Sequence, residues 1–292
     1  MTEGARGVVP FGDRLAAVFD ARGRLCVGID PHAHLLAAWG LPDSASGVRE
    51  FGLRVVDAAA GRAGTVKPQV AFFERFGAAG YAALEEVLSA ARAAGLLVIA
   101  DAKRGDIGTS VAAYAESWLT PGSPLEADAL TIAAFQGVGS IDAPMRLAEA
   151  TGKGLFVLAA TSNPEAATLQ QAVVASGPNT GYTVARAIIE DVQVFTQGQP
   201  PHPFASVGLV LGATLDLPAF GIDTERVYAP AFPVLAPGFG HQGALVADAP
   251  RLFGSLAPGV IVSESRGLLA TGPDGIAAAI AGRSEEVRAA HA

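Results

Sequence analysis

Three charged residues, Asp101, Lys103 and Asp106, lie within six positions at the end of an apolar run. That run, residues 96–100, predicts a strand buried on both faces, as in a parallel sheet. Because side chains alternate along a strand, Asp101 and Lys103 would share a face, and Gly105 would permit a turn that directs Asp106 elsewhere. Opposite charges at the end of a buried strand are typical of catalytic groups with tuned pKa values. A solvated loop with a chance Asp–Lys pair fits this stretch alone equally well.

Eight short apolar runs alternate with helical stretches and would form the frame for these charges. Strands are predicted at residues 25–29, 64–68, 96–100, 129–132, 154–160, 207–211, 233–236 and 260–263. Helices are predicted at residues 11–21, 48–60, 80–94, 111–119, 144–150, 182–195 and 273–281. This pattern matches an α/β fold, the (β/α)₈ TIM barrel, as a single domain over residues 1–292 with an insert at about 165–203. An open doubly wound sheet is the alternative, but the first strand lacks the glycine-rich turn of dinucleotide-binding folds.

The first three predicted strands all end in charged residues, namely Asp30, Lys67 and the group Asp101, Lys103 and Asp106. Barrels of this type build their active sites from residues at the carboxyl ends of several strands. Charges that served only stability would be expected on helix faces instead. The strand ends therefore predict a catalytic array.

The loops after the seventh and eighth strands have the composition of an anion site. Glycines in residues 236–243 and 263–267 let backbone N–H groups approach an anion, Gln242 adds amide donors, and Arg266 offers a planar fork for phosphate oxygens. Barrels often bind phosphate in these two loops. A glycine-rich turn alone is most often only a turn, but together with Arg266 it favours a phosphate site.

With these residues in view, the chain from about Phe11 to Leu269 resembles the orotidine 5′-phosphate decarboxylases, which make UMP in pyrimidine synthesis. The most specific part is the Asp-x-Lys-x-x-Asp motif at residues 101–106. The sequence of residues 102–108, Ala-Lys-Arg-Gly-Asp-Ile-Gly, resembles that of the longer subgroup found in mycobacteria and related bacteria. The long insert after Asn163 also resembles that subgroup.

The resemblance implies roles for the charged residues. Asp30 would bind the ribose hydroxyls, and Lys67 would bind ribose and hold Asp101 in place. Asp101 would lie beside the substrate carboxylate, and Lys103 would deliver a proton to C6 of the pyrimidine. Asp106 would reach the neighbouring subunit's site.

The remaining roles implied by the resemblance concern binding. Ile107 and Ser110 would accompany Asp106 across the interface of a homodimer, although threonine is usual at the Ser110 position. The helix at 111–119 is a natural interface element. Ser162 would read the pyrimidine amide edge. Gln242 and Arg266 would bind the phosphate, and backbone N–H groups near Gly240 and Gly267 would donate further hydrogen bonds to it. Pro237 would also contact the substrate.

The expected chemistry agrees with these roles. Loss of CO₂ from C6 leaves a vinyl carbanion without a π system to accept it, so the site must stabilise localised charge. An ammonium fixed at that carbon does so electrostatically and then donates the proton, which requires no metal and no cofactor. Crowding between Asp101 and the substrate carboxylate would be relieved as CO₂ leaves.

Two rival functions share some of these features. Magnesium-dependent decarboxylases of sugar-acid phosphates use a similar motif with a glutamate beside the second strand, where this chain has Lys67-Pro68-Gln69 and Glu74 lies well beyond. A barrel that only binds a phosphorylated ligand or acts as a scaffold would not need Lys103 between two aspartates. His32 and His34 suggest a metal, but without a third nearby ligand a loop role is favoured.

Composition excludes several other classes. The net charge of −8 leaves no basic stripe for nucleic acid. Cys26 is the single cysteine, so no intrachain disulfide can form, in agreement with a reducing compartment. The first residues lack a signal-peptide core, and no apolar run approaches the roughly 18 residues of a membrane span. A cytoplasmic enzyme without membrane contact is expected.

Overall fold

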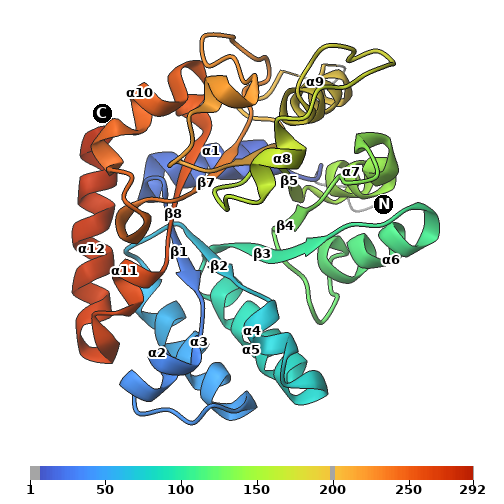
Figure 1. Ribbon diagram of the computed structural model, residues 1–292. Helices are drawn as coiled ribbons and strands as arrows, with labels where there is room; N and C mark the ends of the chain where they lie inside the picture. The colour runs from blue at the N-terminus through green and yellow to red at the C-terminus, as the bar shows by residue number, and fades with distance from the viewer. Residues whose placement is uncertain (1–6, 198–200, 292) are drawn as a thin grey trace.

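A closed barrel of eight parallel strands forms the centre of the molecule, with the strands in sequence order from β1 to β8 (Figure 1). Each strand pairs with the next, and β8 pairs with β1 to close the ring. The structure is a computed structural model that describes residues 7–197 and 201–291. The barrel confirms the predicted (β/α)₈ TIM fold. Residues 198–200 of the predicted insert lie outside the described residues, and the single-domain organisation over 1–292 stays a prediction.

All eight predicted strands are present. They are β1 Leu25–Ile29, β2 Thr65–Pro68, β3 Leu97–Arg104, β4 Ala129–Ile132, β5 Gly154–Ala160, β6 Val207–Leu211, β7 Val234–Pro237 and β8 Val260–Glu264. The third strand runs to Arg104, four residues past its predicted end. Its charged end still pairs with β4, after an irregularity in register between Ala100 and Arg104. Asp101 and Lys103 therefore lie inside a strand and not in the loop after it.

Helices cover the outside of the barrel in the described parts of the chain (Figure 1). The long ones are α1 Phe11–Arg22, α3 Ala45–Ala59, α5 Gly77–Ala93, α6 Gly108–Leu119, α7 Asp142–Thr151, α9 Val184–Thr196 and α12 Gly272–Ala290. The short ones are α2 Ala33–Ala38, α4 Ala71–Glu74, α8 Ala166–Gln170, α10 Ala249–Phe253 and α11 Arg266–Leu269. Turns of 3₁₀ helix occur at η1 Val138–Ile141, η2 Leu217–Phe220, η3 Gly240–Gln242, η4 Val246–Asp248 and η5 Gly254–Gly259. No described helix has the length and apolar character needed to cross a membrane.

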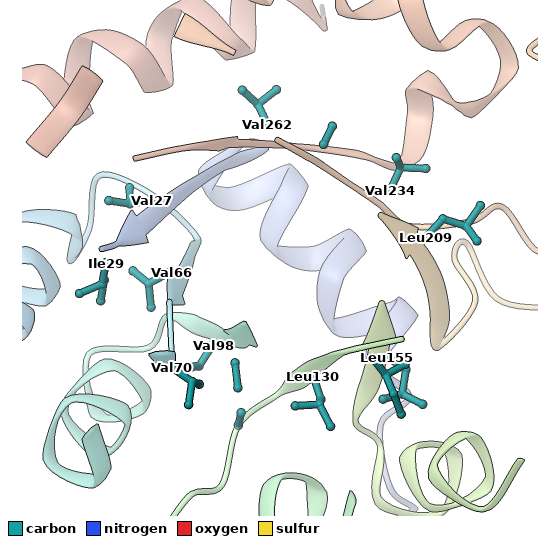
Figure 2. Close-up of a cluster of buried hydrophobic side chains, with 14 of the residues drawn as sticks. Val27, Ile29, Val66, Val70, Val98, Leu130, Leu155, Leu209, Val234 and Val262 are labelled. Carbon is teal, nitrogen blue, oxygen red and sulfur yellow. The ribbon is translucent and has the colours of Figure 1, made fainter. Parts of the chain in front are cut away.

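Alternation along the strands divides the core into two layers. Outward side chains such as Val27, Val98 and Val262 pack under the surrounding helices, and Figure 2 shows them around the ring of strands. Inward side chains fill the barrel interior, including Cys26, Ile99, Ala129, Phe156, Val210, Leu235 and Ile261. The same alternation carries polar side chains inward at the carboxyl ends, where the interior opens to form the site.

Helix α1 closes the amino-terminal end of the barrel. Its Phe11 is fully buried and meets the ring of Phe156 edge-on, with ring centroids 6.0 Å apart. Gly154 at the start of β5 makes room for this ring, because a Cβ there would come within 2.6 Å of it. One end of the barrel is thus packed with apolar side chains, which leaves the other end for chemistry.

Replacing Phe11 by Ala should destabilise the chain by about 3–5 kcal/mol, because it removes a buried ring and leaves a cavity that the rigid barrel cannot fill. Urea unfolding measures the change. The exposed Val194 of α9, replaced by Ala, is the control and should change stability by less than about 0.5 kcal/mol. Equal effects of the two substitutions would contradict the conclusion that α1 stabilises the barrel by closing its amino-terminal end.

Candidate active site

A pocket opens at the carboxyl ends of the strands and collects most of the predicted site residues. Eight of the twelve line it, namely Asp30, Lys67, Asp101, Lys103, Ser162, Pro237, Gln242 and Arg266. They come from β2, β3 and β7, from the loops after β1 and β5, and from η3 and α11, which follow β7 and β8. The pocket therefore has the position expected for the active site of a barrel.

The carboxylate of Asp101 lies at the centre of the pocket floor and receives four hydrogen bonds. Lys67 Nζ and Gln69 Nε2 donate to Oδ2 at 2.6 and 3.0 Å. Lys103 Nζ and Thr131 Oγ1 donate to Oδ1 at 2.6 and 2.9 Å. Each oxygen thus accepts one hydrogen bond from an ammonium group and one from a neutral donor. Together the four bonds occupy the four acceptor positions of the carboxylate. Asp101 is held as an anion and has no free position at which to act as a base.

The pKa values of this cluster follow from burial and charge. Burial alone would raise the pKa of Asp101, but the adjacent ammonium groups of Lys67 and Lys103 outweigh it and hold that pKa well below its usual range. Burial likewise disfavours the charged form of Lys67, but Asp101 and Asp30 raise its pKa above the ordinary value. The buried pair therefore stays ionised at neutral pH.

Lys103 differs from Lys67 in its exposure. Its side chain is 48% exposed and projects into the pocket, whereas the Lys67 side chain is 9% exposed and forms part of the floor. The Lys103 ammonium is therefore the one that a ligand in the pocket can meet while Asp101 holds it in place.

The two carboxylate oxygens of Asp30 differ: one accepts a hydrogen bond and the other accepts none from the described residues. Ser265 Oγ donates to Oδ2 at 2.5 Å, and Oδ1 is buried without a hydrogen-bond donor from the described residues. Gly28 allows this contact, because a Cβ at that position would come within 2.6 Å of Ser265 Cβ. A buried acceptor at the pocket wall is suited to receive a ligand hydroxyl.

Gln242 lies in η3, and Arg266 is the first residue of α11, so the two loops predicted to bind phosphate face the same pocket. Glu264, the last residue of β8, lies against both loops and also lines the pocket. It is 3% exposed and forms an ion pair with Arg283 at 2.8 Å. Burial raises the pKa of Glu264, and Arg283 opposes that shift. A Cβ at Gly240 would come within 2.4 Å of the Glu264 carboxylate, so a glycine is required there.

Four predicted site residues do not line the pocket of their own chain. Asp106, Ile107 and Ser110 follow the end of β3 and enter α6, with Ile107 60% exposed. The Ile107 N–H donates to Asp106 Oδ1 at 2.8 Å, which holds that carboxylate in the turn. At Gly267, the fourth, a Cβ would come within 2.4 Å of the Glu264 carboxylate.

Four further residues in contact with the predicted ones were not predicted from the sequence as site residues, namely Gln69, Thr131, Glu264 and Ser265. Strand alternation could have found two of them, because Gln69 is two positions after Lys67 and Thr131 is a polar residue at an inward position of β4. No group of three or more His, Cys, Asp and Glu side chains in the described parts of the chain could hold a metal. His32 and His34 instead stack on each other, 5.3 Å apart, and His32 packs against Phe72.

With this geometry established, comparison with known proteins gives the family. The model of the orotidine 5′-phosphate decarboxylase / HUMPS family matches residues 23–278, most of the chain. The chain belongs to this family. A curated orotidine 5′-phosphate decarboxylase of Streptomyces coelicolor is 48% identical over 266 residues, which are 91% of each protein. One from Corynebacterium glutamicum is 44% identical over 265 residues, 90% of this chain and 92% of the relative.

Solved structures agree with the family assignment. A crystal structure from Streptomyces avermitilis aligns with a TM-score of 0.90 at 45% identity and covers 99% of both chains. The structure of Leishmania donovani OMP decarboxylase aligns with a TM-score of 0.70 at 31% identity and covers 97% of this chain and 98% of the other. The family resemblance drawn from residues 101–106 is confirmed.

Replacing Asp101 by Asn should destabilise this family member by about 3–5 kcal/mol at pH 7, because the buried Lys67 ammonium loses its main counter-charge. In the native chain the raised pKa of Lys67 means that its contribution to stability is lost only above the unfolded pKa of about 10.4. In the variant, burial lowers the pKa of Lys67, so the unfolded state binds more protons and stability should rise between about pH 7 and 10. Urea unfolding across this pH range measures both effects.

The exposed pair of Asp43 with Arg75 offers a matched control. The substitution Asp43→Asn should change stability by less than about 1 kcal/mol and should produce no rise with pH, because solvent screens the pair. If Asp101→Asn shows the same small, pH-independent change as Asp43→Asn, Asp101 is not the counter-charge that stabilises the Lys67 ammonium.

Proposed function

We propose that this chain is an orotidine 5′-phosphate decarboxylase that converts orotidine 5′-phosphate to UMP and CO₂ in de novo pyrimidine biosynthesis, in the cytoplasm. The observation that carries the proposal is the Lys103 ammonium, which projects into the pocket from a buried carboxylate, opposite the anion-binding loops. The curated relatives with that enzyme name, 48% identical over nine-tenths of the chain, support the substrate.

The shape of the site suits a ligand with an anionic group at each end. Arg266 and Gln242 would bind the phosphate, and the unpaired oxygen of Asp30 would accept a ribose hydroxyl. Ser162, in the loop after β5, would read the amide edge of the pyrimidine. The orotate carboxylate would then lie beside Asp101. Binding energy from the phosphate end would hold that carboxylate against Asp101.

The reaction needs no electron acceptor in this arrangement. The bond between C6 and the carboxylate carbon breaks, CO₂ leaves, and the electron pair stays on C6. The ammonium of Lys103 would stabilise this charge and then transfer a proton to C6, after which water would return a proton to the lysine. Asp101 would act through position and charge, since all four of its acceptor positions are filled.

The magnesium-dependent rivals require a glutamate at the end of the second strand. Here that position is occupied by Gln69, whose amide donates to Asp101. Glu74 lies on α4, accepts hydrogen bonds from Tyr81 and Arg104 at 2.8 and 3.0 Å, and does not line the pocket. A barrel that only bound phosphate would have no use for the buried ion cluster, which favours the decarboxylase.

Turnover of orotidine 5′-phosphate, followed by ultraviolet absorbance, should proceed with EDTA present. The substitution Lys103→Ala should lower kcat by at least about a thousandfold, because it removes both the proton donor and the stabilising charge. Binding of UMP, measured by calorimetry, serves as the control for folding and should persist in the variant. A requirement for magnesium, or substantial turnover by Lys103→Ala, would refute the proposed mechanism.

The proposed active unit is a homodimer. Asp106, Ile107 and Ser110 lie outside the pocket of their own chain, and Ile107 presents an exposed apolar side chain beside α6. Tyr114 of α6 and Phe135 after β4 are also exposed, 41% and 76%. This surface would meet a second copy, and Asp106 would complete the partner's site.

A mixing experiment tests the shared site. Asp106→Ala and Lys103→Ala should each be nearly inactive alone. After equal amounts are mixed and exchange subunits, roughly a quarter of the wild-type sites should recover, because each mixed dimer contains one site with both native residues. Mixing Lys103→Ala with Asp101→Asn is the matched control and should recover no activity, because both residues serve the site of their own chain and each site of the mixed dimer therefore keeps one defect. An Asp106 mixture that recovers no more activity than this control would show that Asp106 serves its own chain.

A further inference from the structure

The backbone of Lys103 adopts a conformation that lysine rarely takes. Its φ is +46°, and in the parts of the chain that the structure describes it is the one residue other than glycine with a positive φ. An L-residue is strained there because its Cβ crowds the following carbonyl oxygen. Such a conformation persists only where the surroundings determine it. Something beside Lys103 must therefore hold this backbone.

The pairing of β3 with β4 lacks regular backbone hydrogen bonds next to Lys103. Ala100 pairs with Leu130, and the next pair joins Arg104 to Ile132. Residues 101–103 of β3 therefore stand opposite a single residue of β4, Thr131. This bulge removes ladder bonds from the segment that carries the two charges.

The hydroxyl of Thr131 takes the place of a backbone hydrogen-bond acceptor for Lys103. It accepts a hydrogen bond from the Lys103 N–H at 3.0 Å and donates to Asp101 Oδ1 at 2.9 Å. An N–H can only donate and an ionised carboxylate can only accept, so the hydroxyl proton has one possible direction. Thr131 is 1% exposed on β4, which pairs with a strand on each side. This packing fixes the hydroxyl in place. One buried group thus joins the strained backbone of Lys103 to the carboxylate that binds its ammonium.

We propose that Thr131 is a positioning residue for Lys103. It sets the left-handed backbone of that residue and the orientation of Asp101 Oδ1, and together these determine where the ammonium lies. The inference rests on the proposed role of Lys103 as proton donor. Because Thr131 acts through Lys103, its loss should weaken the chemical step more than the binding of the substrate.

The test compares two substitutions at this position. Thr131→Val keeps the shape of the side chain and removes the hydroxyl, and kcat should fall about tenfold to a hundredfold while KM changes less than about threefold. Thr131→Ser restores the hydroxyl and should return kcat to within about threefold of wild type. If Thr131→Val yields no folded protein, Thr131→Cys keeps the size with a much weaker donor and should show a similar fall.

A second buried threonine controls for the loss of a hydroxyl as such. Thr196 of α9 is fully buried and donates to the Gln193 carbonyl at 3.1 Å. Thr196→Val should leave kcat unchanged. The inference is overturned if Thr131→Val, or Cys in its place, keeps kcat within twofold, if Thr131→Ser is as slow as Thr131→Val, or if KM carries the whole effect.

Lys103→Ala, assayed in the same series, separates this inference from the proposed function. If Lys103→Ala keeps its turnover, the proton-donor assignment fails, and the inference about Thr131 fails with it. If Lys103→Ala is inactive and Thr131→Val is unaffected, only the inference about Thr131 fails. Loss of turnover in both, with rescue by Ser, supports both.

Discussion

The buried carboxylate of Asp101 is the charge on which the rest of the site depends. A carboxylate that is 6% exposed is stable only if it is paired and fully hydrogen-bonded, and Asp101 meets both conditions with two ammonium groups and two neutral donors. The pairing fixes Lys67 and Lys103 as firmly as it fixes Asp101. The same interaction that makes the burial tolerable therefore also preorganises the ammonium that faces the pocket.

Charge balance explains how such a site can take an anion at each end. The side chains that line the pocket include the carboxyl groups of Asp30, Asp101 and Glu264 and the cations Lys67, Lys103 and Arg266. Glu264 lies nearest the anion-binding loops, but Arg283 pairs with it from the side of α12. This pair offsets the negative charge of Glu264, and Arg266 is left to act on a ligand.

The sequence was sufficient to predict the barrel and the charged strand ends. Apolar runs of strand length alternate with helices, and a parallel barrel brings the carboxyl ends of its strands together, so Asp30, Lys67 and Asp101 could be assigned to one site. The bulge in β3 could not be predicted, because periodicity describes regular strands and φ > 0 contradicts the preference of lysine. For that reason the hydrogen bond from the Lys103 N–H to Thr131 and the extension of β3 to Arg104 appeared only in the structure.

Strain at Lys103 is tolerable because the neighbouring strands are rigid. The barrel interior beneath it is filled by Ile99 and Phe156, and α1 packs Phe11 against the latter at the closed end. A rearrangement that relieved the left-handed backbone would break the bond to Thr131 and disturb Asp101, and the buried Lys67 ammonium would then lose its counter-charge. The energy required to disturb the cluster therefore exceeds the energy stored in one strained residue. The apolar core and the buried charges act together to keep a single reactive geometry.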